Sequence, residues 1–230
     1  MKAVISGASR GIGKAITEQL AQEGAELILL ARGEHGLNKL SDSISSKNAT
    51  IHSFPLDLSQ EESFNLIEEK RDLFQGVTTI INNLGIYSTQ EADRINIKTL
   101  QNQINVNLYS AIQLTQALLH QSTNSTISRI INIGSVMSLN ASPNAADYSI
   151  SKHAFKGWND SLRDKLRFEG IKVSAIYPGA VNTSSWDGID APREEMIQAK
   201  DIAKAVSYIL SLSENTLIEE IRISPQTFGS

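Results

Sequence analysis

The sequence predicts an α/β protein with a doubly wound, mostly parallel β-sheet, and three observations favour this fold class. Short apolar runs typical of strands alternate with longer amphipathic stretches typical of helices through all 230 residues. The strand-like runs are continuously apolar, which indicates a sheet covered by helices on both faces. No linker, repeat or low-complexity stretch interrupts the alternation, so residues 1–230 are expected to form a single domain.

The expected elements follow one another along the chain. "KAVIS" at 2–6 predicts the first strand, a helix is expected from Gly11 to about Glu23 with Gly24 as its cap, and "LILLA" at 27–31 predicts the second strand. The remaining expected elements are a helix near 37–46, a strand near 51–55, a helix near 61–74, a strand at 78–82, a helix near 99–120, the strand "RIINIG" at 129–134, a helix from 148 to about 169 capped by Gly170, the strand "KVSAIYPG" at 172–179, a helix near 201–212 and the strand "EEIRI" at 219–223.

Two longer irregular segments, 85–98 and 180–200, interrupt this alternation. Both follow the C-terminal ends of expected strands. Ligands bind at that edge of a doubly wound sheet, and connecting loops there carry function. The binding site is therefore expected at this edge, with a short substrate loop near 184–199.

Composition excludes several classes of function. The chain is 40% hydrophobic and 20% charged, with a net charge of -4, so nucleic acid and anionic membranes are not expected as partners. The apolar stretches are too short to span a bilayer, and a strand at the very start leaves no room for a signal peptide, so the cytoplasm is the expected compartment. There are no cysteines and the four histidines are scattered, so no metal site is expected.

A glycine-rich turn, "SGASRGIG", joins the first strand to the first helix. Gly7, Gly11 and Gly13 follow the pattern G-x-x-x-G-x-G. Glycines permit a tight turn and close backbone approach, and the N-terminus of the helix presents free N–H groups to a phosphate. The turn therefore predicts a dinucleotide site, with a turn that binds no ligand as the alternative.

Cofactor choice depends on the end of the second strand. Sheets that bind NAD usually place an acid there, but this sequence has Ala31 and Arg32, with no acid before Glu34. Arg32, together with Arg10 in the glycine turn, is expected to face the 2′-phosphate of NADP(H). One charge-assisted hydrogen bond contributes about 1.5 to 3 kcal/mol, so NADP(H) is favoured over NAD(H); two solvated surface arginines are the alternative.

The stretch "YSISKHAF" places Tyr148 four residues before Lys152. Residues four apart lie one turn apart on the same side of a helix, so both side chains can reach a common point. On its own this spacing more often describes an aromatic residue at a helix start and a solvated lysine.

Five motifs occur together and in order: "SGASRGIG", "DL" at 57–58, "NNLG" at 82–85, "YSISK" at 148–152 and "PGAVNT" at 178–183. On these motifs the chain resembles the short-chain dehydrogenase/reductase family from Lys2 to about Pro225. The resemblance implies a Rossmann-type three-layer sandwich with a mostly parallel, seven-stranded sheet. It also implies an NAD(P)-dependent oxidoreductase that acts on a small-molecule carbonyl or alcohol, and a homo-oligomer, either a dimer or a tetramer.

The resemblance assigns roles to single residues. It makes Tyr148 the proton donor, Lys152 its activating lysine, Ser135 the group that holds the substrate oxygen, and Asn107, with Asn105 as the alternative, the anchor of a water relay. It places Asp57 at the adenine ring, and Val181 and Thr183 near the nicotinamide carboxamide. The full set of expected cofactor contacts is Gly7, Ser9, Arg10, Gly11, Ile12, Gly13, Arg32, Asp57, Leu58, Asn83, Gly85, Tyr148, Lys152, Pro178, Gly179, Val181 and Thr183.

The chemistry requires an acid that works near neutral pH. A phenol has a pKa near 10, and a unit positive charge at about 4 Å contributes some 4 kcal/mol at an effective dielectric of 20. Lys152 is therefore expected to lower the pKa of Tyr148, with an oxidised nicotinamide adding to the effect.

The chain departs from the family pattern at three places. Leu84 stands where the family usually has alanine and is expected to crowd or reshape the pocket. Gly134 replaces the usual serine before Ser135. Ser6 replaces the usual threonine, which keeps the hydroxyl and loses a methyl group.

The substrate is not apparent from the sequence. Trp186 is the only aromatic residue in the short segment 183–195, and packing or an oligomer contact is its favoured interpretation. Other expected wall residues are Ile86, Tyr87, Met137 and Leu139, and the short segment predicts an open cleft with loose specificity for aldehydes or ketones. A catalytically idle NADPH-binding sensor or scaffold is the alternative to an enzyme. An epimerase or dehydratase of the longer relatives fits poorly, because 230 residues leave no room for an added substrate domain.

Overall fold

A single seven-stranded parallel sheet organises the molecule. The computed structural model describes residues 1–44, 49–120 and 126–227. The strands lie in the order β3-β2-β1-β4-β5-β6-β9, and every neighbouring pair is parallel. Their bounds are β1 Lys2–Ser6, β2 Glu26–Ala31, β3 Thr50–Pro55, β4 Thr79–Asn82, β5 Arg129–Ile133, β6 Lys172–Pro178 and β9 Glu220–Ile223. The predicted doubly wound, seven-stranded fold is confirmed.

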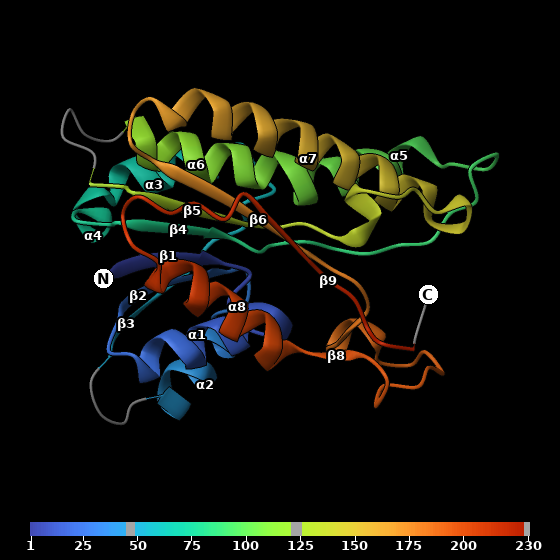
Figure 1. The fold of residues 1–230 in the computed structure, drawn as a ribbon, viewed down its shortest axis with the longest axis horizontal. Helices are drawn as coiled ribbons and strands as arrows, with labels where there is room; N and C mark the ends of the chain where they lie inside the picture. The colour runs from blue at the N-terminus through green and yellow to red at the C-terminus, as the bar shows by residue number, and fades with distance from the viewer. Residues whose placement is uncertain (45–48, 121–125, 228–230) are drawn as a thin grey trace.

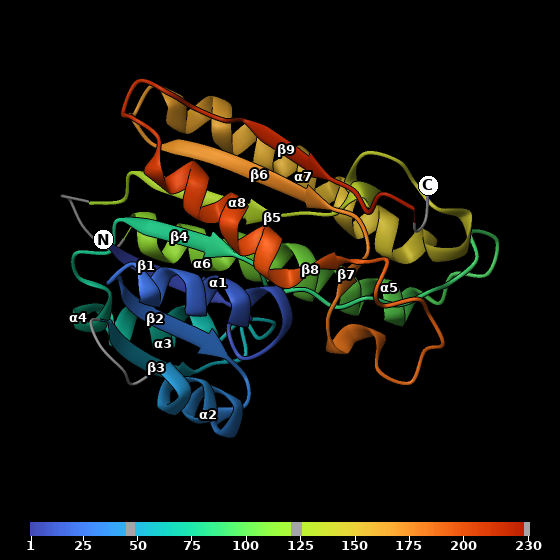
Figure 2. The same cartoon turned by 60° about the horizontal axis from the view of Figure 1, so that its bottom comes forward.

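Helices cover both faces of this sheet (Figures 1 and 2). One face carries α1 Gly11–Gln22, α2 Glu34–Ile44 and α8 Ala199–Ser211. The other carries α3 Ser63–Glu69, α4 Arg71–Phe74, α5 Ile97–Ile104, α6 Ser110–His120 and α7 Ala146–Arg167. The strand order reverses between β1 and β4, so the turns after these two strands diverge at the C-terminal edge and leave a crevice there.

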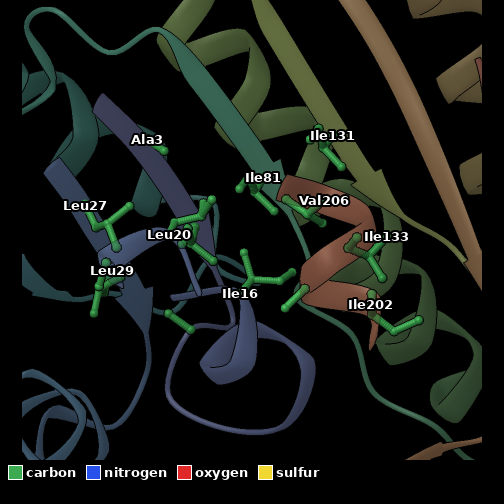
Figure 3. Close-up of a cluster of buried hydrophobic side chains, with 14 of the residues drawn as sticks. Ala3, Ile16, Leu20, Leu27, Leu29, Ile81, Ile131, Ile133, Ile202 and Val206 are labelled. Atoms are coloured by element: carbon green, nitrogen blue, oxygen red, sulfur yellow. The ribbon is translucent and has the colours of Figure 1, made fainter. Parts of the chain in front are cut away.

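Two apolar cores fill the spaces between the layers. The first packs α1, α2 and α8 against the sheet through Ile16, Leu20, Leu29 and Val206, all fully buried (Figure 3). The second packs α3, α6 and α7 against the opposite face and includes Ile80 and Leu114. Because both faces are apolar, the strands show the continuous hydrophobic runs seen in the sequence.

Some helices differ in extent from the prediction. The helix expected near 61–74 is two helices, because the backbone at Lys70 leaves helical geometry (φ -98°, ψ 22°). The helix expected near 99–120 begins earlier, at Ile97, because the Asn96 side chain caps it by accepting from the N–H of Lys98 at 2.9 Å. It also contains a π-helical turn, Asn105–Tyr109. The helix expected near 37–46 begins at Glu34, and residues 45 and 46 lie outside the described residues.

The helix that carries Tyr148 also begins before its predicted start. It starts at Ala146 and runs to Arg167. The segment expected to be irregular over 180–200 contains two short strands, β7 Val181–Asn182 and β8 Ile197–Gln198, which pair in parallel. It lies at the same end of the molecule as α5 in both views (Figures 1 and 2).

A chain of buried amides crosses the second core. The amide of Asn82 on β4 donates to Asn132 on β5 at 2.8 Å and to Thr115 on α6 at 3.0 Å. The Asn132 amide donates in turn to Asn159 on α7 at 2.8 Å. Asn82 and Asn132 are directly opposite each other in the sheet. The chain therefore links two strands and two helices through polar contacts in an apolar environment.

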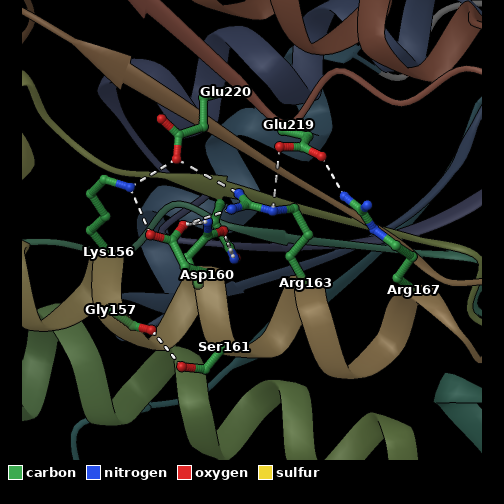
Figure 4. A network of polar contacts seen from close by, with 10 residues as sticks. Lys156, Gly157, Asp160, Ser161, Arg163, Arg167, Glu219 and Glu220 are labelled. Atoms are coloured by element: carbon green, nitrogen blue, oxygen red, sulfur yellow. Dashed lines mark hydrogen bonds and ion pairs between the residues drawn. The ribbon is translucent and has the colours of Figure 1, made fainter.

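An ion-pair network joins the edge strand β9 to α7 (Figure 4). Lys156 contacts Asp160 at 2.7 Å and Glu220 at 2.8 Å, and Arg163 lies 3.7 Å from Glu220. Arg167 pairs with Glu219. Several charges that share partners hold the strand more effectively than isolated surface pairs do.

The described residues contain neither a membrane-spanning helix nor a metal-binding cluster. Across 1–44, 49–120 and 126–227, no helix is both long and apolar enough to cross a membrane. In the same ranges no three acidic or histidine side chains are arranged to hold a metal ion.

Candidate active site

A cleft of about 880 Å³ opens along the C-terminal edge of the sheet. The turn after β1, the ends of β2, β4 and β5, the start of α7 and the segment after β6 all contribute to its walls. Its volume is within the range of roughly 300–1,000 Å³ that is typical of ligand sites.

Most of the residues predicted for the site line this cleft. They are Gly7, Ser9, Arg10, Gly11, Ile12, Arg32, Asp57, Leu58, Asn83, Gly85, Ser135, Tyr148, Lys152, Pro178, Gly179, Val181 and Thr183. Gly13 and Asn107 do not line it. A Cβ atom at Gly13 would lie 2.2 Å from the carbonyl oxygen of Gly7, so this glycine allows α1 to close against the turn.

The glycine turn forms a cradle suited to an anion. Gly7 and Gly11 have positive φ angles of 65° and 56°, which favour glycine, and a Cβ at Gly7 would meet the backbone of Leu84 at 3.0 Å. Arg10 begins α1 without a capping side chain, and the first turn of the helix has no acid. The first N–H groups of α1 are therefore available to a bound phosphate, and the residues fit the pyrophosphate of a dinucleotide.

The end of the cleft that is predicted to hold the adenosine contains two cations and one acid. Arg10 and Arg32 line it, and neither forms an ion pair with another described residue. Asp57 is the only acid among the described residues that line the cleft. The N–H and hydroxyl of Ser59 donate to one Asp57 oxygen at 3.1 and 2.7 Å, which fixes the carboxylate at the end of β3.

Ser6 joins two walls of the cleft. Its hydroxyl oxygen accepts from the N–H groups of Asn83 at 3.0 Å and Leu84 at 3.1 Å. The Asn83 amide donates back to the carbonyls of Ser6 at 3.1 Å and Gly7 at 3.2 Å. The sequence presented Ser6 only as a replacement for threonine; the hydroxyl that it retains holds the ends of β1 and β4 together.

Tyr148, Ser135 and Lys152 meet at the other end of the cleft. Ser135 follows β5 and caps a short helical turn, where its oxygen accepts from the N–H of Met137 at 3.1 Å. The Ser135 side chain lies close enough to the Tyr148 phenol to lower its pKa. Lys152 lies one turn further along α7 and is 3% exposed, and its Nζ atom is 3.4 Å from the carbonyl of Ile133 and 5.8 Å from the centre of the Tyr148 ring.

Burial dominates the titration of both groups. It raises the pKa of Tyr148 to about 12, and the Ser135 side chain opposes this increase only in part. Burial also lowers the pKa of Lys152 to about 8. The pKa of Tyr148 is thus raised and not lowered as expected, because desolvation of the phenol outweighs the other effects even though the Lys152 ammonium lies over the ring.

Asn107 lies behind the cleft wall, within the π-helical turn. Its amide nitrogen donates to the carbonyl of Ile86 and to Ser151, each at 3.0 Å, and its oxygen accepts from the N–H of Ile86 at 2.8 Å. The fully buried side chain therefore binds a neighbouring segment rather than its own helix backbone. A Cβ at Gly85 would lie 3.4 Å from the Asn107 oxygen and 3.6 Å from Lys152 Nζ, so only Gly85 separates the two groups.

Two aromatic residues extend from Tyr148 along the cleft wall. The Tyr87 ring packs edge-on against Tyr148 with centres 4.9 Å apart, and Trp186 lies 6.5 Å from Tyr87. Ile86 and Met137 line the cleft as expected, whereas Leu139 does not. Arg193 holds the Trp186 segment, because it donates to Asn182 at 2.8 Å and to the carbonyl of Thr183 at 2.6 Å.

Two departures from the family pattern have physical explanations. Leu84 packs against the second apolar core and also lines the cleft. A Cβ at Gly134 would lie 2.6 Å from the Tyr177 ring, so the Tyr177 side chain occupies the space of the usual serine. The sequence could not reveal this pairing, because the two residues are 43 positions apart.

Other residues near the site were missed by the sequence arguments. Arg222, Ser224 and Pro225 line the cleft from the last strand and the turn after it. The fully buried carboxylate of Asp147 accepts from Ser88 and from the Gln90 amide. Asp147, which directly precedes Tyr148, thus links the segment after β4 to the start of α7. Strand alternation in "EIRI" is the one signal that would have placed Arg222 on a polar face.

The fold and the cleft define the class of dinucleotide-binding α/β proteins. The family model for short chain dehydrogenases matches residues 1–194. A 3-oxoacyl-(acyl-carrier-protein) reductase of Haemophilus influenzae is 30% identical over 220 residues, covering 91% of this chain and 90% of that one. The chain belongs to the short-chain dehydrogenase/reductase family and is an oxidoreductase.

Solved structures agree with this assignment. An alcohol dehydrogenase from the archaeon Thermococcus sibiricus, complexed with 5-hydroxy-NADP, has a TM-score of 0.87 at 26% identity and covers 96% of this chain and 95% of that one. A metagenomic short-chain oxidoreductase in complex with NADP has a TM-score of 0.84 at 26% identity, covering 98% and 97%.

Proposed function

We propose that this protein is an NADPH-dependent reductase that converts an aldehyde or ketone to an alcohol, or catalyses the reverse reaction. The observation that carries the proposal is the convergence of the Tyr148 phenol and the Ser135 hydroxyl beside the buried ammonium of Lys152. A protein that only binds a nucleotide has no physical need for this costly arrangement.

The three side chains have complementary roles in reduction. The Ser135 and Tyr148 hydroxyls donate hydrogen bonds to the carbonyl oxygen and hold it in place. Because the pKa of Tyr148 is raised to about 12, the phenol stays protonated at neutral pH and donates its proton as the oxygen gains charge. A bound reduced nicotinamide supplies the hydride. With a pKa of about 8, Lys152 keeps its charge at pH 7 and binds ribose hydroxyls.

Asn107 supports proton return to the tyrosine. Its hydrogen bonds to Ile86 leave its oxygen next to Gly85 and Lys152. This placement favours the role of anchor for a water relay between Lys152 and solvent, and disfavours Asn105 as the alternative.

The cofactor proposal rests on the unpaired arginines. Arg10 and Arg32 lie at the adenosine end without acidic partners among the described residues, and Ala31 leaves no carboxylate for a ribose 2′-hydroxyl. Several structurally similar enzymes carry NADP or its derivative. We therefore expect Arg32→Asp to weaken NADPH binding at least tenfold, measured by titration, with NADH binding unchanged or improved. An unchanged NADPH affinity would remove the arginine argument.

A redox sensor or scaffold that binds NADPH without turnover is the second candidate, because a fold does not compel activity. The deciding experiment follows NADPH oxidation at 340 nm against aldehydes, ketones, quinones and 3-ketoacyl thioesters, with Tyr148→Phe as the blank. We expect turnover that disappears in Tyr148→Phe while NADPH binding persists. Tight NADPH binding without turnover by the wild type on any substrate would favour the sensor.

We further propose a single domain over 1–230, a substrate loop near 184–199, a cytoplasmic location and a homo-oligomer. Exposed aromatic residues on one helix end and one helix face support the oligomer, since Phe168 is 92% exposed and Tyr208 is 58% exposed. Light scattering on the purified protein gives the state, and a monomer at micromolar concentration would contradict it.

A further inference from the structure

Arg222 is a cation that the proposed reaction leaves unassigned. It lies on β9, directly opposite Tyr177 on β6, and lines the cleft. Its neighbours in the strand, Ile221 and Ile223, pack against the first apolar core. Because side chains alternate along a strand, Arg222 projects from the opposite face, which is the face that carries α7.

The acids nearest in sequence to Arg222 are already paired. Glu220 shares its face of the strand but contacts Lys156 at 2.8 Å and Arg163 at 3.7 Å (Figure 4). Arg222 instead donates from Nε to the hydroxyl of Ser224 at 3.3 Å, the next residue on the same face toward the cleft. Within the described residues Arg222 forms no ion pair, so its charge is not neutralised by the protein.

The sheet separates Arg222 from the arginines assigned to the cofactor. Neighbouring strands are about 4.8 Å apart. β9 lies five strand intervals from β2, after which Arg32 follows, so the two arginines are roughly 24 Å apart across the sheet and cannot bind one phosphate. In contrast, β9 lies two intervals, roughly 10 Å, from β5, which leads into Ser135. An arginine side chain spans most of that distance.

We propose that the substrate carries an oxyanion, either a carboxylate or a phosphate ester, and that Arg222 binds it while Ser135 and Tyr148 hold the carbonyl oxygen. This inference rests on the proposed reductase function. The planar guanidinium matches both kinds of oxyanion, and its two Nη groups remain free because Nε donates to Ser224. Asp57, the only acid among the described lining residues, lies at the end predicted to hold the adenosine, and the nearby Glu220 is paired with Lys156 and Arg163.

Matched pairs of carbonyl compounds test the proposal. Acetoacetate is compared with methyl acetoacetate, and dihydroxyacetone phosphate with dihydroxyacetone, by kcat/KM with NADPH for the wild type and Arg222→Gln. We expect the wild type to prefer at least one anion over its neutral partner by about tenfold, and Arg222→Gln to lose that preference while the neutral compounds are reduced as before. The pair that responds identifies the kind of oxyanion. Arg71→Gln, an exposed arginine on α4 outside the cleft, is the control for the loss of one charge.

A binding measurement tests the oxyanion site independently of the proposed reductase activity. Acetoacetate and dihydroxyacetone phosphate are titrated into NADPH-loaded Tyr148→Phe protein with and without Arg222→Gln, which needs no turnover. Binding that weakens about tenfold on loss of Arg222 supports the oxyanion site even if no compound is reduced. The oxyanion site is overturned if the anions bind and react equally well with and without Arg222. If neutral carbonyls are reduced in that case, the reductase proposal still holds.

Discussion

Replacing Lys152 with methionine should stabilise the protein while abolishing its activity. Lys152 is 3% exposed, and the hydrogen bond of its ammonium to the carbonyl of Ile133 is long, at 3.4 Å. Burial lowers its pKa from 10.5 to about 8. Each pH unit corresponds to about 1.4 kcal/mol, so keeping this charge costs the folded state up to about 3 kcal/mol at pH 7. Methionine has a similar length and no charge, so we expect Lys152→Met to raise the unfolding free energy by about 1–3 kcal/mol.

Urea unfolding without cofactor measures this difference. Below pH 8 Lys152 is charged in both the folded and the unfolded wild type, so the folded state bears the full free-energy cost of burying this charge. Between pH 8 and 10 the unfolded chain binds more protons at this group, so the stability of the wild type rises relative to that of Lys152→Met. Lys156→Met is the matched control one turn along the helix: its ammonium pairs with Asp160 and Glu220, which raises its pKa, so that variant should lose roughly 0.5–1 kcal/mol. A Lys152→Met protein less stable than the wild type at pH 7, or a difference that does not change with pH, would refute the reasoning.

Three further substitutions test other contacts. Gly134→Ser should lower the free energy of unfolding, measured in urea, by at least about 2 kcal/mol, because the serine Cβ would lie 2.6 Å from the Tyr177 ring. Tyr177→Val in the same chain should recover part of that loss. If the effects of the two substitutions simply add, the contact is contradicted. Ser6→Ala should cost about 1–3 kcal/mol and weaken NADPH binding, because it leaves two N–H groups without their acceptor; Ser6→Thr is the control that keeps the hydroxyl. The Asp147 carboxylate links the segment after β4 to α7, so Asp147→Ala should increase amide hydrogen exchange around Ser88. The same substitution should raise KM more than it lowers kcat. Unchanged hydrogen exchange would contradict this role of Asp147.

Local patterns predicted the layers of the fold and most of the cleft. Continuous apolar runs follow from burial on both faces, and the C-terminal edges of parallel strands must meet, so the glycine turn could be placed at this edge from the sequence pattern, whereas Tyr148 needed the resemblance. The resemblance to a family supplied Ser135 and Asn107, which no spacing argument would have selected.

Contacts between distant segments could not be predicted. The exclusion of a side chain at Gly134 depends on Tyr177, and the direction of the Tyr148 pKa depends on how deeply the phenol is packed. The π-helical turn that directs Asn107 toward Ile86 leaves no signal in helical periodicity, because it adds one residue to an otherwise regular pattern.

The buried amide chain has a consequence for how accurately the sheet assembles. The Asn82 amide can donate to the Asn132 oxygen only when β4 and β5 pair in the native register. If β5 shifted by one residue relative to β4, the Asn132 amide would turn to the opposite face, where the first core offers apolar side chains, and it would be buried away from Asn82. The isoleucines of "TIIN" and "RIINI" discriminate less between registers, because both strands place isoleucine on each face of the sheet. The asparagines thus favour the native pairing of the two central strands over pairings shifted by one residue.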